Sequence, residues 1–259
     1  MKQVFFLLAL LFSQPIFGFY AGVGFGWNTI DEVFSSNLFI NGGTSGQDRY
    51  KTHMNRLAPF VKVGHQFFFC CDNGFVGLSA EWKYLGYNTP NENSSRGQIL
   101  PNAEFSSFNF FGPEVTRDFT SKTRLNNEVM LLASFGGCIT QGYVFLAFGT
   151  VFFDASNRIF VSSVHIPNGS GSHLVSTSVR DHKIIWGGAA RAGYQYFFCH
   201  NYFFDISYTF LQTGKNHFKN AVNAAILNGS DTPGPVTLFL NRDIKFTVQE
   251  IILSMNFAF

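Results

Sequence analysis

The sequence contains little charge. Charged residues make up 13% of the 259 residues, against about 25% in an average soluble domain. The net charge is only +2 and no Lys/Arg cluster appears, so we expect no nucleic-acid partner. A run of about 20 apolar residues is also lacking, which excludes a helical membrane anchor. The abundant residues are Phe and Gly, with 34 and 25 copies, a composition that favours a β-protein of the cell envelope.

Cysteine is scarce as well. The four cysteines fall at or beside predicted short turns, and an oxidising compartment would allow disulfides there, although the sequence leaves their pairing open. They lack the two-pair spacing of a zinc site, so we expect neither a metal nor another cofactor. The four residues are Cys70, Cys71, Cys138 and Cys199.

The carboxyl-terminal segment is the most informative stretch. Apolar residues alternate with small or polar ones, so one face of a strand here meets an apolar medium. The closing strand of a transmembrane β-barrel has this pattern because its outer face contacts lipid. The outward residues are Ile251, Leu253, Met255, Phe257 and Phe259.

The amino-terminal segment agrees with this interpretation. Residues 1–18 combine a basic start, an uncharged apolar run and a small residue at the end. That pattern predicts a signal peptide, and the run is too short for a spanning helix. We therefore expect a signal peptide over 1–18 and a single barrel domain over 19–259.

Period-two alternation predicts eight strands. The gaps between them are alternately short and long, which is typical of short periplasmic turns and long extracellular loops. Alternation places Leu125 on the outer face, whereas the strand at 143–153 is apolar on both faces and its register stays open. Residues 217–228, within the last long gap, predict a short helix. The predicted strands cover 19–27, 57–69, 75–85, 125–139, 143–153, 184–196, 203–211 and 245–259.

The predicted fold class is all-β: an eight-stranded antiparallel transmembrane barrel. The chain resembles the outer-membrane family that includes OmpA-type and Opa-type proteins, and most of the chain takes part in the resemblance. In that family a terminal Phe belongs to the signal read by the barrel assembly machinery, which implies this role for Phe257 and Phe259. The resemblance also implies location in the bacterial outer membrane, among its lipids and lipopolysaccharide. It rests on Phe-Tyr-Ala-Gly-Val-Gly-Phe-Gly from Phe19, Val-Lys-Val-Gly-His-Gln from Val61 and Met-Asn-Phe-Ala-Phe from Met255.

Seven charged residues fall on the inner face of the predicted strands. Buried charges must be paired or hydrated, and the interior of an eight-stranded barrel is only wide enough for side chains. We expect them to form a salt-bridge network that plugs the lumen, with a narrow ion path or a gate as the alternative. The seven are Lys62, Glu81, Lys83, Glu128, Arg191, Asp205 and Glu250.

Any specific function is expected in the loops, because the family shares architecture while its members differ in activity. The aromatic residues Phe105, Phe108, Phe110 and Phe111 either pack over the barrel mouth or contact a host or surface ligand. Histidines also occur in these gaps, but no nucleophile motif surrounds them, so we assign no catalytic residue and expect no enzyme. The histidines are His53, His165, His173, His182 and His217.

The sequence therefore predicts an outer-membrane barrel with a structural or adhesin-like surface role and a plugged lumen. A narrow porin-like channel and a lipid-modifying outer-membrane enzyme are the alternatives.

Overall fold

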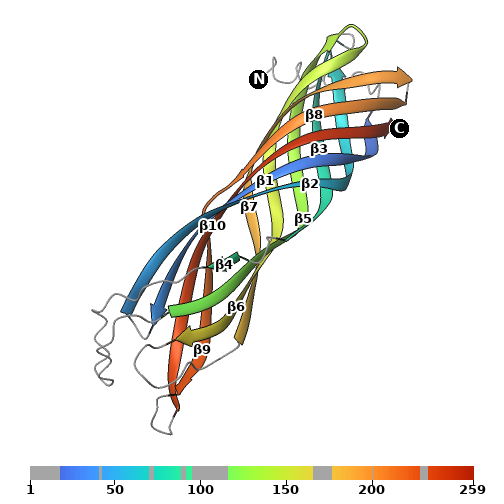
Figure 1. Ribbon diagram of the computed structural model, residues 1–259. Coiled ribbons are helices and arrows are strands. Elements are labelled where there is room, and N and C mark those ends of the chain that lie inside the picture. The colour runs from blue at the N-terminus through green and yellow to red at the C-terminus, as the bar shows by residue number, and fades with distance from the viewer. Residues whose placement is uncertain are drawn as a thin grey trace.

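Eight strands close into an antiparallel barrel (Figure 1). The computed structural model describes residues 18–40, 43–69, 73–88, 92–94, 116–165, 177–199, 201–227 and 233–259. Neighbouring strands follow the order β1-β2-β3-β5-β6-β7-β8-β10, and β10 pairs back onto β1. The barrel strands are β1 (Phe19–Ile40), β2 (Gly43–Phe69), β3 (Gly74–Asn88), β5 (Thr116–Ile139), β6 (Gly142–His165), β7 (Thr177–Cys199), β8 (Tyr202–Thr213) and β10 (Pro233–Ala258).

The predicted all-β, eight-stranded antiparallel barrel is thus confirmed. Short turns join β2 to β3, β5 to β6 and β7 to β8 at one end of the barrel, where Phe19 and Phe259 also lie. Within the described ranges, no helix is long and apolar enough to cross a membrane.

The long gaps differ from the prediction because much of their length is strand. β1 runs on to Ile40 and β2 begins at Gly43, where the sequence indicated a loop from 28 to 56. The predicted helix over 217–228 is wrong: residues 217–227 lie in β9 (Asn216–Leu227), which pairs with β10. A further short strand, β4 (Glu92–Ser94), pairs with β5. Cross-strand pairing supplies the backbone partners here, and it outweighs the weak local helical pattern.

The barrel wall has an apolar exterior next to the short turns. In β1 the outward residues alternate from Phe19 to Trp27, a nine-residue stretch that suits a tilted strand crossing a bilayer. All three tryptophans of the chain point outward, toward the end of this band that faces the long connections. They are Trp27 (51% exposed), Trp82 (46%) and Trp186 (68%). Tryptophan is enriched at membrane interfaces, so this position suits the edge of the bilayer. We call this outer surface the apolar band.

A β-bulge in β5 changes the face on which one predicted residue lies. Asn126 and Asn127 in β5 both lie opposite Asp154 of β6, and each donates a hydrogen bond to its carboxylate at 3.2–3.3 Å. The extra residue reverses the alternation beyond it. Leu125, predicted to face outward, is therefore completely buried inside.

The open register of β6 is also resolved. Phe145, Ala147, Val151 and Phe153 point inward, and the alternate residues point outward.

Beyond the apolar band the barrel continues as two four-stranded sheets. The β2–β3 ladder begins at Phe60↔Lys83, and the β7–β8 ladder ends at Gly187↔Thr213. Further along, the pairings continue separately as β2-β1-β10-β9 and β3-β5-β6-β7 (Figure 1). Pro59, which has no N–H to donate, stands at the first of these separations. Arg56 Nη1 donates to Gly86 O at 2.6 Å across it, and Lys183 Nζ donates to His217 O at 3.3 Å across the other.

Deleting residues 257–259 tests how the barrel closes. The last residues pair with both neighbours: Phe257 lies opposite Ala21 and Tyr202, and Phe259 N donates to Phe19 O at 2.9 Å. Most of the truncated protein should therefore fail to reach the outer membrane in the compact form that runs faster on unheated gels. Normal assembly of the truncated chain would contradict this account of closure.

A variant carrying Phe257→Leu and Phe259→Leu is the control for the assembly signal. It keeps strand length and outward apolarity but removes both aromatic rings. Assembly of this variant together with failure of the truncation would mean that closure matters and Phe itself does not.

Candidate functional site: the lumen and the outer wall

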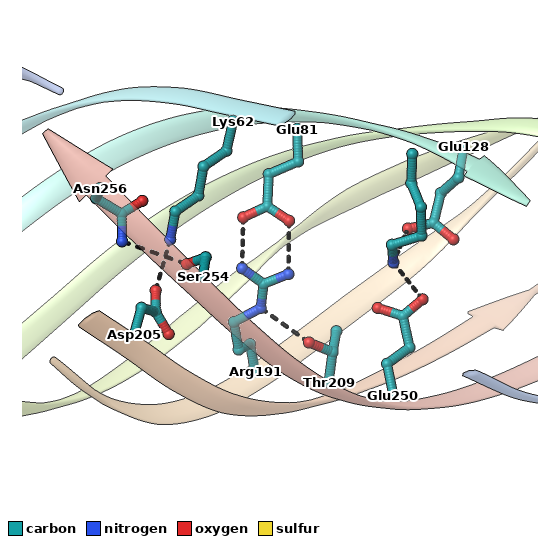
Figure 2. Close-up of polar contacts among 10 residues, drawn as sticks. Lys62, Glu81, Glu128, Arg191, Asp205, Thr209, Glu250, Ser254 and Asn256 are labelled. Carbon is teal, nitrogen blue, oxygen red and sulfur yellow. Dashed lines mark hydrogen bonds and ion pairs between the residues drawn. The ribbon is translucent and has the colours of Figure 1, made fainter. Parts of the chain in front are cut away.

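The centre of the lumen holds a layer of ion pairs. Arg191 of β7 donates two hydrogen bonds to Glu81 of β3, at 2.5 and 2.7 Å, and its Nε donates to Thr209 at 2.8 Å (Figure 2). Arg191 and Glu81 are 4% exposed. A bidentate guanidinium–carboxylate pair is among the strongest side-chain interactions, and this one joins opposite walls of the barrel.

Two lysines complete the layer. Lys62 of β2 donates to Asp205 of β8 at 2.7 Å. Lys83 of β3 contacts two carboxylates, Glu128 of β5 at 2.9 Å and Glu250 of β10 at 2.5 Å. All seven charged residues predicted for the lumen therefore lie inside and belong to one of these three groups. With three cations and four carboxylates, two glutamates share a single ammonium.

Apolar side chains lie on both sides of the ion pairs. Toward the short turns, Tyr20, Phe197 and Phe203 make ring contacts at 4.8–5.4 Å, and Phe68 packs against Tyr143. Toward the long connections, the inner faces of the two sheets form a continuous buried cluster. It includes Ile30, Leu85, Leu125, Phe153, Ile185, Leu211, Phe246 and Val248. Charged groups between such layers are shielded from water, so they depend on one another for stabilisation.

A second polar group, which the sequence pattern did not predict, lies deeper in the two-sheet region. Glu32 of β1 accepts a hydrogen bond from Thr123 at 2.8 Å, and the Tyr87 hydroxyl donates to the same carboxylate at 3.4 Å. Arg242 of β10 donates to Asn157 at 3.2 Å and stacks on Phe34, 4.1 Å from the ring centroid. The alternation in β1 could have indicated Glu32, because every second residue from Tyr20 through Gly24 to Glu32 points inward. The predicted strand ended too early to include it.

Four histidines predicted for the loops lie on strands: His165 is the last residue of β6, and the other three are on the outer wall. His53 contacts Asp31, His182 contacts Asp154, and His217 contacts Asp243. These pairs lie just beyond the apolar band. Partial burial acts to raise the pKa of Asp154, but hydrogen bonds from His182, Asn126 and Asn127 outweigh it and hold that pKa below its ordinary value.

Other candidates fall outside the part of the chain that is described. This applies to the loop aromatics Phe105, Phe108, Phe110 and Phe111, to His173, and to the side chains of Cys70, Cys71 and Cys199. Cys138 is a free, exposed thiol. Phe257 and Phe259, the candidate assembly signal, point outward and are 40% and 67% exposed.

A closed antiparallel barrel with an apolar outer band and charged side chains inside is the architecture of an integral outer-membrane protein. The chain has this eight-stranded fold, and its location is the bacterial outer membrane. It is 22% identical over 249 residues to outer membrane protein P1 of Coxiella burnetii, covering 93% of this chain and 86% of that protein. No family model matches the chain.

Solved outer-membrane proteins are similar over most of their length. OprG of Pseudomonas aeruginosa is 15% identical with a TM-score of 0.43, covering 93% of this chain and 96% of OprG. Neisserial surface protein A is 11% identical with a TM-score of 0.33, covering 93% and 97%. Ail of Yersinia pestis, solved with a heparin analogue, is 13% identical with a TM-score of 0.31, covering 91% and 99%.

Replacing Arg191 with Ala tests the ion-pair layer. The change leaves Glu81 buried without its two donors, and breaking a buried pair in this way costs about 3–5 kcal/mol. The unfolding midpoint in detergent, followed by circular dichroism or by gel mobility, should fall clearly.

Glu128→Gln is the matched control, because it removes the second carboxylate from Lys83 and leaves the Lys83–Glu250 pair. Its midpoint should stay close to that of the wild type. Equal losses in both variants would mean that the individual pairings do not determine stability.

Proposed function

We propose that this protein is a non-conducting outer-membrane barrel that presents a surface for interaction, in the manner of an adhesin. The observation that carries the proposal is the contrast between its lumen and its extension. The lumen is filled by apolar, ionic and again apolar layers, whereas two four-stranded sheets extend beyond the apolar band.

The filled lumen argues against a channel. Lys62, Glu81, Lys83 and Arg191 are each at most 4% exposed, and an eight-stranded barrel has only enough interior room for its own side chains. A permeating ion would have to separate pairs that join opposite walls. We therefore propose that the seven charges act as a plug.

The extension supports a surface role. Long β-hairpins carry the connections well away from the membrane, and irregular segments held on a rigid scaffold are common binding sites. The aromatic loop segment that includes Phe105 and Phe108 is our candidate contact for a host or surface ligand. Phe257 and Phe259 are, by the same proposal, the residues that the barrel assembly machinery recognises.

One observation favours a second candidate, a lipid-modifying enzyme. Ser156 of β6 lies directly opposite His182 of β7, and His182 contacts Asp154, so the three residue types of a hydrolytic triad meet on the outer wall. Ser156 is 4% exposed, however, and a nucleophile must reach its substrate. Because Ser156 is buried, we rank the enzyme below the surface-interaction role.

A conductance measurement separates the plug from a channel. Planar bilayers that contain the purified protein should show little stable current at neutral pH, because an ion could pass only by separating buried ion pairs such as Arg191–Glu81. A large, steady conductance from the wild type would overturn the plug and promote the channel.

An attachment assay tests the surface role. Bacteria that display the protein should bind host cells or extracellular matrix, and antibodies against segment 95–115 should block binding. Deleting the same segment should abolish attachment while the barrel still assembles. Turnover of labelled phospholipid or lipid A that is lost in both Ser156→Ala and His182→Gln would instead identify the enzyme.

A further inference from the structure

The exposed charges in the described part of this barrel are of one sign. Among the side chains that the structure describes, every exposed charged residue is basic, and every acid is buried or half-buried. The exposed cations all lie beyond the apolar band, on the side of the long connections. They are Lys51, Lys122, Arg124, Arg158, Arg180, Lys183, Lys215 and Lys219.

Four of these cations gather on the outer face of three neighbouring strands. In the register, Lys122 of β5 lies opposite Arg158 of β6, and Arg158 lies opposite Arg180 of β7. Arg124, two residues from Lys122, is on the same face. We call Lys122, Arg124, Arg158 and Arg180 the cationic patch. Residues directly opposite across strands have Cβ atoms about 4.5–5.5 Å apart, and like charges at that spacing destabilise a sheet.

The same three strands become apolar nearer the short turns, beyond a polar stretch in which Ser156 lies opposite His182 and Asp154 accepts hydrogen bonds from Asn126 and Asn127. Their outward residues include Val129, Phe152, Ile184 and Trp186, and the last two are 66% and 68% exposed. A ligand that lies along this wall therefore meets hydrocarbon on one side and clustered guanidinium and ammonium groups on the other. Only an amphiphile with an anionic head group satisfies both halves.

We propose that the cationic patch binds the phosphate groups of a phosphorylated glycolipid in the outer leaflet, whose acyl chains pack against the apolar band. Guanidinium groups match phosphate oxygens in bidentate fashion, and a phosphate between the opposed cations converts their repulsion into attraction. Lipopolysaccharide is an expected neighbour of any outer-membrane barrel, and this proposal assigns the residues that hold its head group. It goes beyond the surface-interaction role and does not depend on it.

Thermal unfolding in detergent micelles provides the test. The probes are diphosphorylated lipid A, the same lipid with its phosphates removed, and inorganic tripolyphosphate. Diphosphorylated lipid A should raise the unfolding midpoint of the wild type, and the rise should shrink at high salt. The lipid without phosphates should give little of this rise, and so should tripolyphosphate, which lacks acyl chains.

The informative variant is Lys122→Gln with Arg180→Gln, which removes the two cations that stand opposite Arg158 in the register. Without lipid its midpoint should equal or exceed that of the wild type, because repulsion is relieved. Its apparent affinity for diphosphorylated lipid A should fall roughly 30-fold, from the loss of two basic residues near a phosphate. A purely structural role of these residues would not give both results.

The matched control is Lys51→Gln with Lys215→Gln. It removes the same number of charges from two exposed lysines, Lys51 in β2 and Lys215 just before β9, which pair with Asp31 and Asp243. This control should keep the wild-type response to lipid A. Equal losses of lipid A affinity in both double variants would overturn the proposed site and indicate general charge attraction instead. If tripolyphosphate raised the wild-type midpoint as much as lipid A does, the ligand would be a soluble polyanion and not a lipid.

Discussion

Closure of the sheet inside a lipid bilayer is the constraint on which the rest of this molecule depends. Hydrocarbon offers no hydrogen bonds, so every strand in the membrane needs a partner on both sides, and β1 must pair with β10. Once Ala21 pairs with Phe257, this register sets which residues of the neighbouring strands point into the barrel and which point outward. A slip of one residue would turn Lys62, Glu81 and Arg191 toward lipid. The closing register therefore determines which side chains lie in the lumen.

The contents of the lumen follow from that parity. Inward positions have no access to lipid and little to water, so their charged groups are stable only in contact with opposite charges. Arg191–Glu81 and Lys62–Asp205 each connect strands far apart around the barrel, and so they brace the ring across its interior. Breaking such a cross-brace affects both walls.

The two-residue repeat of side-chain direction in a strand explains how much of the lumen could be predicted from sequence. Alternation is clear in most strands that have one face toward lipid, and it identified inward charges such as Lys62 and Asp205. It failed in β6, where inward residues such as Phe145 and Phe153 are apolar as well. It did not reveal which charges pair, because pairing depends on the shear of the closed barrel. It also failed where one face does not meet lipid: beyond Trp27 both faces of β1 are mixed, so the strand seemed to end and Glu32 was missed. The bulge at Asn126–Asn127 gave no signal because its cause lies in Asp154, a partner 27–28 residues away.

The outer wall raises a different question, because nothing about closure requires cations to stand opposite one another there. Lys122 and Arg180 could be exchanged for neutral residues without disturbing a single ladder hydrogen bond, and the sheet would lose two like charges that stand opposite Arg158. Ser156 and His182 form the next row of the same strands, two residues nearer the apolar band. A lipid held by its phosphates at the patch would lie over that row. The outer face of the two-sheet extension would thus bind a ligand without involving the loops. If Ser156 is a nucleophile, the cationic patch would position its substrate.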